Sequence, residues 1–511
     1  MAARGIHVRG SPHTDAAACG VNVTLRVDAS SHVGHGHLRR CLTLADALTQ
    51  HGARCHFICR DHDGHLGDLV TANHHQLSLL PRDPKTRFDA NDYASWVGAR
   101  WQDDAQQSQA LVQADPPDWL IVDHYGLDAR WEHAVAPAST RTLVIDDLAN
   151  RRHDCDLLLD QTWGRDAADY DHCVPKHADV LCGSRFSLLR PEFAEHRTQA
   201  LARRWQGAPE RLLMTFGGAD TGDLTLRALA AIANTPLADN LSITVIAAGA
   251  EANHRRLTDC IAEHRLNARV LSNFTTMARM LTDADIAIGA AGSSSWERAC
   301  LGLPTILLRT ADNQADAFAR LVDSGCTVGI RDVSLLPDAL SQLIATRRKL
   351  SLLSATLSDG LGADRVVSAM RQSPATEETS VAPIAPSELP DILNALSPQA
   401  RAGVQTGVDG QPSTPLMHAG IDAMTHPSCA LLQLRRHAET IGLLAIHITD
   451  NRIQVDCISD RQGAEADATA ALQPLLGVHM PMDICPVTPH QWARNRANQA
   501  IGHTRLPHRY A

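Results

Sequence analysis

The feature that most constrains the fold is an alternation of short apolar runs with helical patterns over the first 370 residues. The runs VNVTLRV, DWLIVDHYG and TLVIDDLA end in polar or acidic groups, as strands of a parallel sheet do at their carboxyl ends. The segment GHLRRCLTLADALTQHG, residues 36–52, has the apolar spacing of an amphipathic helix closed by glycine. A second set of runs begins near residue 210. This rhythm predicts two doubly wound α/β domains with a ligand crevice between them.

The chain is too long, at 511 residues, for one ordinary hydrophobic core. Residues 374–420 are rich in Pro, Ser, Thr and Ala, and apolar strand patterns resume after them. We therefore expect a disordered leader (1–20), an N-terminal Rossmann-like domain (21–200), a C-terminal Rossmann-like domain (201–372), a linker (373–425) and a small α+β module (426–511).

Composition excludes several classes of protein. The net charge of −10 comes without a long basic run, so we expect no nucleic-acid partner. No apolar stretch approaches the roughly 20 residues that cross a bilayer, and residues 1–20 lack the apolar segment of a signal peptide. We expect a cytoplasmic protein without a membrane partner, of undetermined oligomeric state. The 13 cysteines are scattered without a CxxC pair, against a disulfide framework or zinc ribbon.

The stretch RVDASSHVGHGHLRRCLTLADAL carries the first candidate site. A strand ends at Asp28, and Gly34 and Gly36 allow a tight turn and a close approach of backbone to ligand. The helix start directs free amides at that ligand. His37 can take a proton from water near neutral pH, and a nearby carboxylate, for which Asp28 is a candidate, could orient it.

A metal interpretation of this stretch is less favoured. His32, His35 and His37 are spaced by three and two residues, which suits no regular helical face. No cysteine or carboxylate completes a familiar ligand set. We expect His32 and His35 to be solvated loop residues and the protein to need no metal or other cofactor.

Glycine-rich and small-residue loops follow strands of the second domain. Ala290, Ala291, Gly292, Ser293 and Ser294 precede a helix, so amides and hydroxyls could converge on a diphosphate. Glu297 could accept hydrogen bonds from ribose hydroxyls, or it could merely complement the helix dipole. Further candidates for nucleotide or sugar contacts are Gly217, Gly218, Asp220, Asp312, Asn313 and Gln314. The glycine pair could equally be an ordinary tight turn. Together these groups describe a site for a nucleotide-diphosphate sugar.

The carboxyl ends of two N-terminal strands carry the remaining candidates. Asp123, His124 and Tyr125 end one strand, and DDLANRRHDCDLLLDQ, residues 146–161, follows the next. We expect these side chains to line the crevice opposite the nucleotide. Asp146 and Arg152 could instead serve as helix caps and ion pairs.

Six ordered motifs resemble those of one enzyme family. They are RVDASSHVGHGHLRRCLTLA, VDHYGLDARWE, DDLANRRHDCDLLLDQ, GSRFSLLRPEF, FGGADTGDLT and GAAGSSSWERACLGLPTILL with DNQ. This set resembles the UDP-2,4-diacetamido-2,4,6-trideoxy-β-L-altropyranose hydrolases of pseudaminic acid biosynthesis, over roughly residues 21–370. His35 and Ala291 depart from the family pattern, which often has a bulkier residue and a glycine there.

The resemblance implies a GT-B fold and an enzyme that hydrolyses the anomeric C–O bond of a UDP-sugar with inversion and without a metal. It places the histidine of the family's GxGHxxR motif at His37, as activator of water, and the arginine at Arg40, beside the substrate. It places the ribose-binding glutamate at Glu297. A GT-B glycosyltransferase and a non-catalytic nucleotide-sugar-binding scaffold remain alternatives.

The C-terminal module weakly resembles an acetyltransferase-like module, with the residues of the motif in altered order. The residues that carry this resemblance are Cys457, Ser459, Arg461, Gly463 and Glu465. The glycine-rich turn that would hold the pyrophosphate of acetyl-CoA is not evident. The alternatives are an active acetyltransferase and a degenerate module used for packing or oligomerisation.

Overall fold

The computed structural model describes residues 20–216, 223–247, 251–272, 276–310, 314–372, 379–396, 405–406, 412–413, 415–436, 439–449, 452–459, 463–476, 482–487 and 492. The expected leader lies outside these ranges, apart from Gly20. Within the described part of the chain, no helix is long and apolar enough to span a bilayer.

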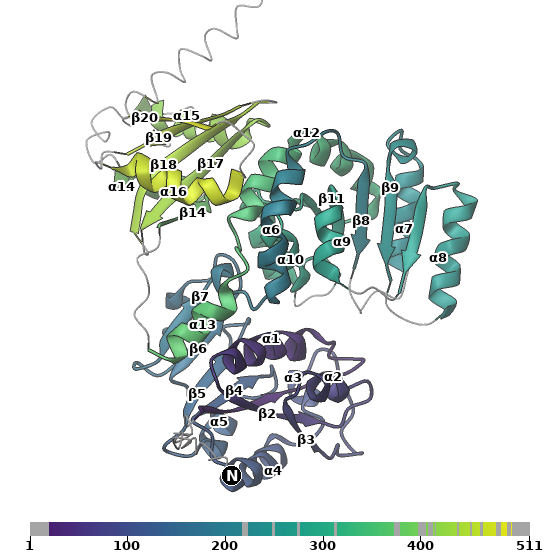
Figure 1. The fold of residues 1–511 in the computed structure, drawn as a ribbon, viewed down its shortest axis with the longest axis vertical. Coiled ribbons are helices and arrows are strands. Elements are labelled where there is room, and N and C mark those ends of the chain that lie inside the picture. The colour runs from purple at the N-terminus through teal and green to yellow at the C-terminus, as the bar shows by residue number, and fades with distance from the viewer. Residues whose placement is uncertain are drawn as a thin grey trace, which may run out of the picture.

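The first domain is a seven-stranded parallel sheet in the order β3-β2-β1-β4-β5-β6-β7 (Figure 1). Its strands are β1 (Asn22–Val27), β2 (Arg54–Arg60), β3 (Gln76–Leu80), β4 (Trp119–Asp123), β5 (Arg141–Ile145), β6 (Leu157–Asp160) and β7 (Asp179–Cys182). Its helices are α1 (Gly36–Gln50), α2 (Gly67–Ala72), α3 (Tyr93–Trp96), α4 (Trp101–Ala114) and α5 (Ala129–Val135). The strand order reverses between β1 and β4, where ligands of doubly wound sheets bind.

The second domain repeats this topology in a six-stranded parallel sheet, β10-β9-β8-β11-β12-β13. Its strands are β8 (Arg211–Thr215), β9 (Ser242–Ile246), β10 (Ala268–Leu271), β11 (Ile286–Ala290), β12 (Thr305–Leu308) and β13 (Val328–Ile330). Its helices include α7 (Asp223–Ala233), α8 (Glu251–Glu263), α9 (Met277–Asp283), α10 (Ser294–Cys300), α11 (Ala315–Asp323) and α12 (Leu336–Ala355). The predicted pair of Rossmann-like domains is confirmed, and it constitutes a GT-B fold.

The chain crosses between the two domains twice, and each crossing ends in a helix. Helix α6 (Pro191–Arg204) packs on α9 of the second domain, whereas α13 (Gly362–Met370) returns to pack on α1 of the first. The crossings lie against each other, because Ser184 Oγ donates to the carbonyl of Leu357 at 2.5 Å. Buried Arg197 of α6 donates to the carbonyls of Ala355 and Ser358. By its packing, α6 belongs to the second domain although it begins before the expected boundary at 200. Likewise, α13 belongs to the first domain although it lies before the expected boundary at 372.

The third module is a five-stranded sheet, β14-β17-β18-β19-β20, in which only the β19–β20 pair of the described strands is parallel. It comprises β14 (Thr379–Pro383), α14 (Leu389–Leu396), α15 (Pro415–Thr425), β17 (Cys429–Arg436), β18 (Glu439–Ile448), β19 (Ile453–Ile458), α16 (Ala464–Leu476) and β20 (Met482–Val487). A separate short hairpin pairs β15 (Gln405–Thr406) with β16 (Pro412–Ser413). The predicted α+β module is confirmed.

Part of the expected linker, residues 373–425, belongs to this module. Strand β14 pairs with β17, and α14 and α15 bury Leu389, Leu393 and Ala423 against the sheet. The Pro-, Ser- and Thr-rich composition of residues 374–420 as a whole concealed this, and β14 is only a short edge strand.

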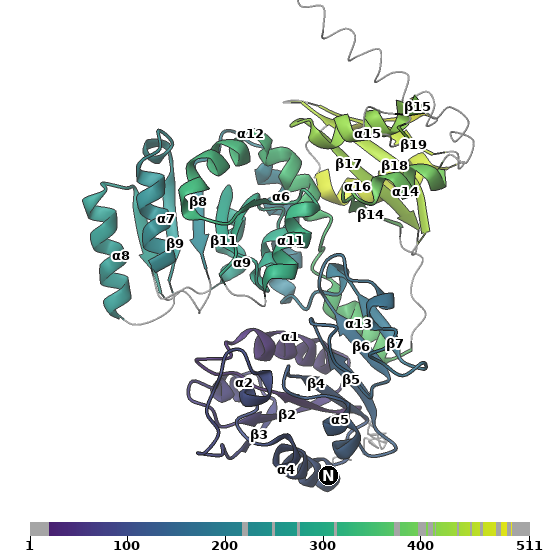
Figure 2. The same ribbon diagram turned by 180° about the vertical axis from the view of Figure 1, so that it is seen from behind.

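The third module also shares a hydrophobic core with the second domain. Helices α6 and α12 lie between the two sheets in both views (Figures 1 and 2). One continuous cluster runs from Leu201 and Leu353 to Leu434 and Leu472. Lys349 on α12 donates to the main-chain carbonyls of Met424 and His426, at 2.5 and 3.0 Å. The module is thus built onto the second domain.

Candidate functional site

A histidine–carboxylate pair occupies the switch point of the first domain. His37, in the first turn of α1, has Nδ1 at 2.7 Å from Oδ1 of Asp123, the last residue of β4. Asp123 is fully buried, whereas 13% of the His37 side chain is exposed. Since an ionised carboxylate can only accept a hydrogen bond, Nδ1 is assigned the proton in this contact and Nε2 the lone pair. No hydrogen bond among the described residues uses Nε2, so this nitrogen can accept a proton.

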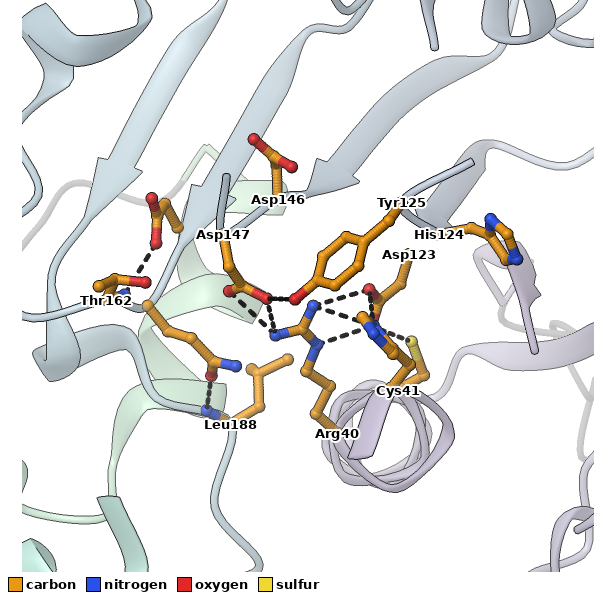
Figure 3. A network of polar contacts seen from close by, with 12 residues as sticks. Arg40, Cys41, Asp123, His124, Tyr125, Asp146, Asp147, Thr162 and Leu188 are labelled. Carbon is orange, nitrogen blue, oxygen red and sulfur yellow. Dashed lines mark hydrogen bonds and ion pairs between the residues drawn. The ribbon is translucent and has the colours of Figure 1, made fainter. Parts of the chain in front are cut away.

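Arg40 links this pair to a second carboxylate (Figure 3). Its Nε and Nη2 donate to the two oxygens of Asp123, each at 2.7 Å, and its Nη1 donates to both oxygens of Asp147, at 3.0 and 2.7 Å. The Tyr125 hydroxyl donates to Asp147 at 2.9 Å, and its ring stands edge-on to His37 with centroids 4.6 Å apart. These contacts fix the His37 ring from two sides.

The charges at this pair follow from its contacts. Burial alone would raise the pKa of Asp123, but Arg40 and His37 together hold that pKa well below its ordinary value. Burial and the neighbouring Asp147 raise the pKa of the Tyr125 phenol. Asp123 therefore stays ionised and can stabilise a protonated His37, while Tyr125 stays a neutral donor.

Asp28 has a different partner from the one we expected. Its carboxylate accepts from Arg26 Nη1 and Nη2 at 2.6 and 2.9 Å and from the Arg60 amide at 2.7 Å. Nε2 of His124 lies 3.3 Å away. Arg26 continues the network to Asp104, and these side chains are buried. Asp28 and His124 thus stabilise the floor beneath the site, and the carboxylate that orients His37 is that of Asp123.

The turn between β1 and α1 is held by Ser30 and Gly34. Their backbones exchange hydrogen bonds at 2.9 and 3.3 Å, and the Ser30 hydroxyl accepts from the amides of His32 and Val33. Gly34 has φ +87°, a conformation that costs other L-residues energy. The predicted glycine turn exists, and it delivers His37 to the sheet edge.

The loop after β11 forms the facing half of the site. Buried Arg298 donates to the carbonyl of Ala290 at 2.6 Å and to the Ser294 hydroxyl at 2.9 Å. A Cβ on Gly289 would lie 2.8 Å from Arg298 Nη1, so glycine leaves room for this brace. No described hydrogen bond occupies the amides of Gly292 and Ser293. The loop therefore presents free donors on a rigid support.

Contacts between the domains bring the two halves together. A Cβ on Gly36 would lie 3.7 Å from Oγ of Ser293. Arg190 approaches Glu297 to 3.9 Å, and Arg165, after β6, lies 3.3 Å from Asp316 at the start of α11. Burial raises the pKa of Glu297 against the opposing effect of Arg190. The two switch-point edges thus face each other at Gly36 and Ser293.

Four of the predicted site residues lie outside the described residues: Gly217, Gly218, Asp220 and Asn313. Asp312 does also. Gln314 is described, and its Nε2 would lie 3.5 Å from a Cβ on Gly292, while its Oε1 accepts from the Thr310 hydroxyl. Of the candidate residues in the tail, Arg461 is outside the described ranges and Cys457 is buried in β19.

The site contains a residue that sequence reasoning did not single out, Asp147. Two adjacent acids, Asp146 and Asp147, follow the strand 141–145, and only Asp146 was named from the sequence. Asp146 accepts from the Ala149 amide and ion-pairs with Arg151 at 2.6 Å, the structural role we held open for it. Asp147 carries the contact with Arg40, because consecutive side chains point in opposite directions.

The fold and site define a GT-B protein with an oriented histidine in its first domain. Comparison of the chain with known proteins gives the following similarities. No family model matches the chain. It is 22% identical over 273 residues to UDP-2,4-diacetamido-2,4,6-trideoxy-beta-L-altropyranose hydrolase of Campylobacter jejuni, covering 53% of this chain and 86% of that protein. It is 20% identical over 320 residues to spore coat polysaccharide biosynthesis protein SpsG of Bacillus subtilis, covering 62% and 86%. Among solved structures, Acinetobacter baumannii MurG superposes with a TM-score of 0.49 at 13% identity, covering 69% and 99%.

Proposed function

We propose that this protein hydrolyses a UDP-linked diacetamido-trideoxy sugar of the altropyranose type to UDP and the free sugar, the reaction of pseudaminic acid biosynthesis. The name of the Campylobacter jejuni relative supports this substrate, and the match covers 86% of that protein. The observation that carries the proposal is the hydrogen bond from His37 Nδ1 to Asp123, which leaves Nε2 without a partner among the described residues. The neighbouring Gly36 lies against Ser293 of the second domain's loop.

In the proposed reaction, His37 Nε2 accepts a proton from water as the water oxygen attacks the anomeric carbon. The bond from that carbon to the diphosphate oxygen breaks, and UDP leaves with the electron pair. Asp123 stabilises the imidazolium, and the configuration inverts because water enters opposite the leaving group. One base suffices, since UDP departs as a stabilised diphosphate.

The second domain is proposed to hold the nucleotide. The amides of Gly292 and Ser293 and the hydroxyl of Ser293 would bind the diphosphate, as oriented donors do for developing negative charge. Gln314, beside this loop, would add a polar contact. Gly217, Gly218, Asp220 and Asn313 stay predictions as ligands of the same substrate half.

The decisive experiment measures UDP release from UDP-2,4-diacetamido-2,4,6-trideoxy-β-L-altropyranose by the purified protein, with and without EDTA. We expect release without any added acceptor and without loss in EDTA. Release only upon addition of an acceptor would instead identify a glycosyltransferase. Tight UDP binding without turnover would identify a binding protein, and either result would overturn hydrolysis.

Glu297→Gln should weaken substrate binding without slowing the chemical step. The carboxylate is proposed to accept from the ribose hydroxyls, and hydrogen bonds to a charged group contribute about 1.5 to 3 kcal/mol. We expect KM to rise by about tenfold or more and kcat to change little. Steady-state kinetics measures both. An unchanged KM would assign Glu297 the alternative role of complementing the helix dipole.

A further inference from the structure

A small cavity lies on the first domain at the same sheet edge as His37. The loops after β1 and β2 and the segment that follows β3 and includes α3 line it, and its lining includes His32, His62, Arg82, Phe88, Trp96 and Gly98. Its volume of about 20 Å³ is room for one group the size of a water molecule or a methyl. A larger cavity, of about 560 Å³, lies at the opposite edge of the second sheet, remote from this chemistry.

Aromatic rings connect this cavity to the candidate base. His32 stacks on Phe88 with centroids 4.8 Å apart, and Phe88 stacks on Trp96 at 5.9 Å. Trp96 lies 5.9 Å from Tyr125, which meets His37 at 4.6 Å. In this series of ring contacts, Tyr125 lies between Trp96 of the cavity wall and His37.

The walls of the cavity are fixed by their own contacts. The Trp96 indole N–H donates to the carbonyl of Asp89 at 3.1 Å, so its polar atom is occupied and its ring serves as an apolar wall. Gly98 has φ +69°, and a Cβ there would collide with the His62 ring. Arg82 and Asp63 pair at 3.0 Å at the polar rim, where both side chains are well exposed. The Phe88 and Trp96 rings form an apolar wall in a cavity whose other lining side chains are mostly polar. Such a wall fits the methyl of a short acyl group, and the polar side chains fit its amide.

We propose that this cavity, defined by His32, Phe88 and Trp96, receives the methyl of one acetamido group of the sugar and thereby selects acetyl over longer acyl substituents. The inference rests on the proposed function, because it assigns part of the same substrate. The size of the cavity sets the selectivity, since one extra methylene in an apolar pocket changes kcat/KM by about 10 to 200-fold.

The test compares the diacetamido substrate with its dipropionamido analogue. Wild-type protein should prefer the acetamido substrate by about tenfold or more in kcat/KM. Phe88→Ala, which removes one wall, should reduce or reverse this preference. Trp101→Ala is the matched control, because Trp101 is partly buried, lies under Arg130 and does not line the cavity. It should keep the wild-type preference, and a preference unaltered by Phe88→Ala would overturn the assignment.

A binding measurement separates this proposal from the proposed reaction. Saturation-transfer NMR on UDP-diacetamido sugar bound to His37→Gln, with turnover suppressed, reports contact at each acetamido methyl. We expect strong transfer to one methyl and its loss on adding Phe88→Ala. Failure of the wild type to release UDP, with this signal intact, would overturn hydrolysis alone. Equal transfer to both methyls in the two variants would overturn the cavity assignment alone.

Discussion

His37→Gln should lower kcat for UDP release by about 10²- to 10⁴-fold, the usual contribution of a positioned general base. Glutamine keeps a polar side chain that can still reach Asp123, so the buried carboxylate retains a partner while the proton acceptor is lost. KM should change little, because the nucleotide is proposed to bind the second domain. Single-turnover and steady-state assays of UDP release check both parameters.

His35→Gln provides the matched control two residues earlier. His35 is partly exposed and precedes α1 without a side-chain capping bond. The same substitution there should leave kcat near the wild-type value. A His37→Gln protein with wild-type kcat would remove His37 from the reaction. Equal losses in both variants would point to disruption of the turn.

Ala468→Glu should destabilise the second domain together with the third module. Ala468 is fully buried on α16, which packs against α6. A buried, unpaired carboxylate costs several kcal/mol. Since about 1 kcal/mol shifts Tm by about 2 to 4 °C in a domain of 150–250 residues, we expect Tm to fall by about 10 °C or more. Thermal unfolding followed by circular dichroism and calorimetry measures it.

The control for Ala468→Glu places the same carboxylate two residues further along α16. Ala470 is exposed on α16, so Ala470→Glu should change Tm little. Because the core is shared, the Ala468→Glu transition should include the second domain. If calorimetry instead resolved a shifted third module beside an unshifted second domain, the two would be independent folding units.

The fold was predictable where strands are buried on both faces. Runs such as Trp119–Asp123 and Ile286–Ala290 are continuous apolar segments, and their order along the chain gives the doubly wound rhythm. Strand β14 has two partly exposed residues and a terminal proline, so it lacks that signal and was assigned to the linker. The packing of α6 and α13 on opposite domains also leaves no local pattern in the sequence from which it could be predicted.

The candidate site was predictable one residue at a time, but its pairing was not. His37 was singled out from a glycine turn and a helix start, both local features. Its partner Asp123 lies 86 residues away, whereas the acid considered from the sequence, Asp28, lies in the same motif as His37. What separates them is Arg26, which shares a strand face with Asp28 and draws that carboxylate into the interior. The number of residues between two side chains does not reveal which of them meet in the fold.

The two domain crossings have a mechanical consequence. They lie side by side, with Arg197 donating to carbonyls of the second crossing, so two paired chain segments join the first and second domains. The third module shares its core with the second domain, and it follows α13, which packs on the first domain. A rotation of the second domain relative to the first would therefore move the third module with the second domain, because those two share one hydrophobic core.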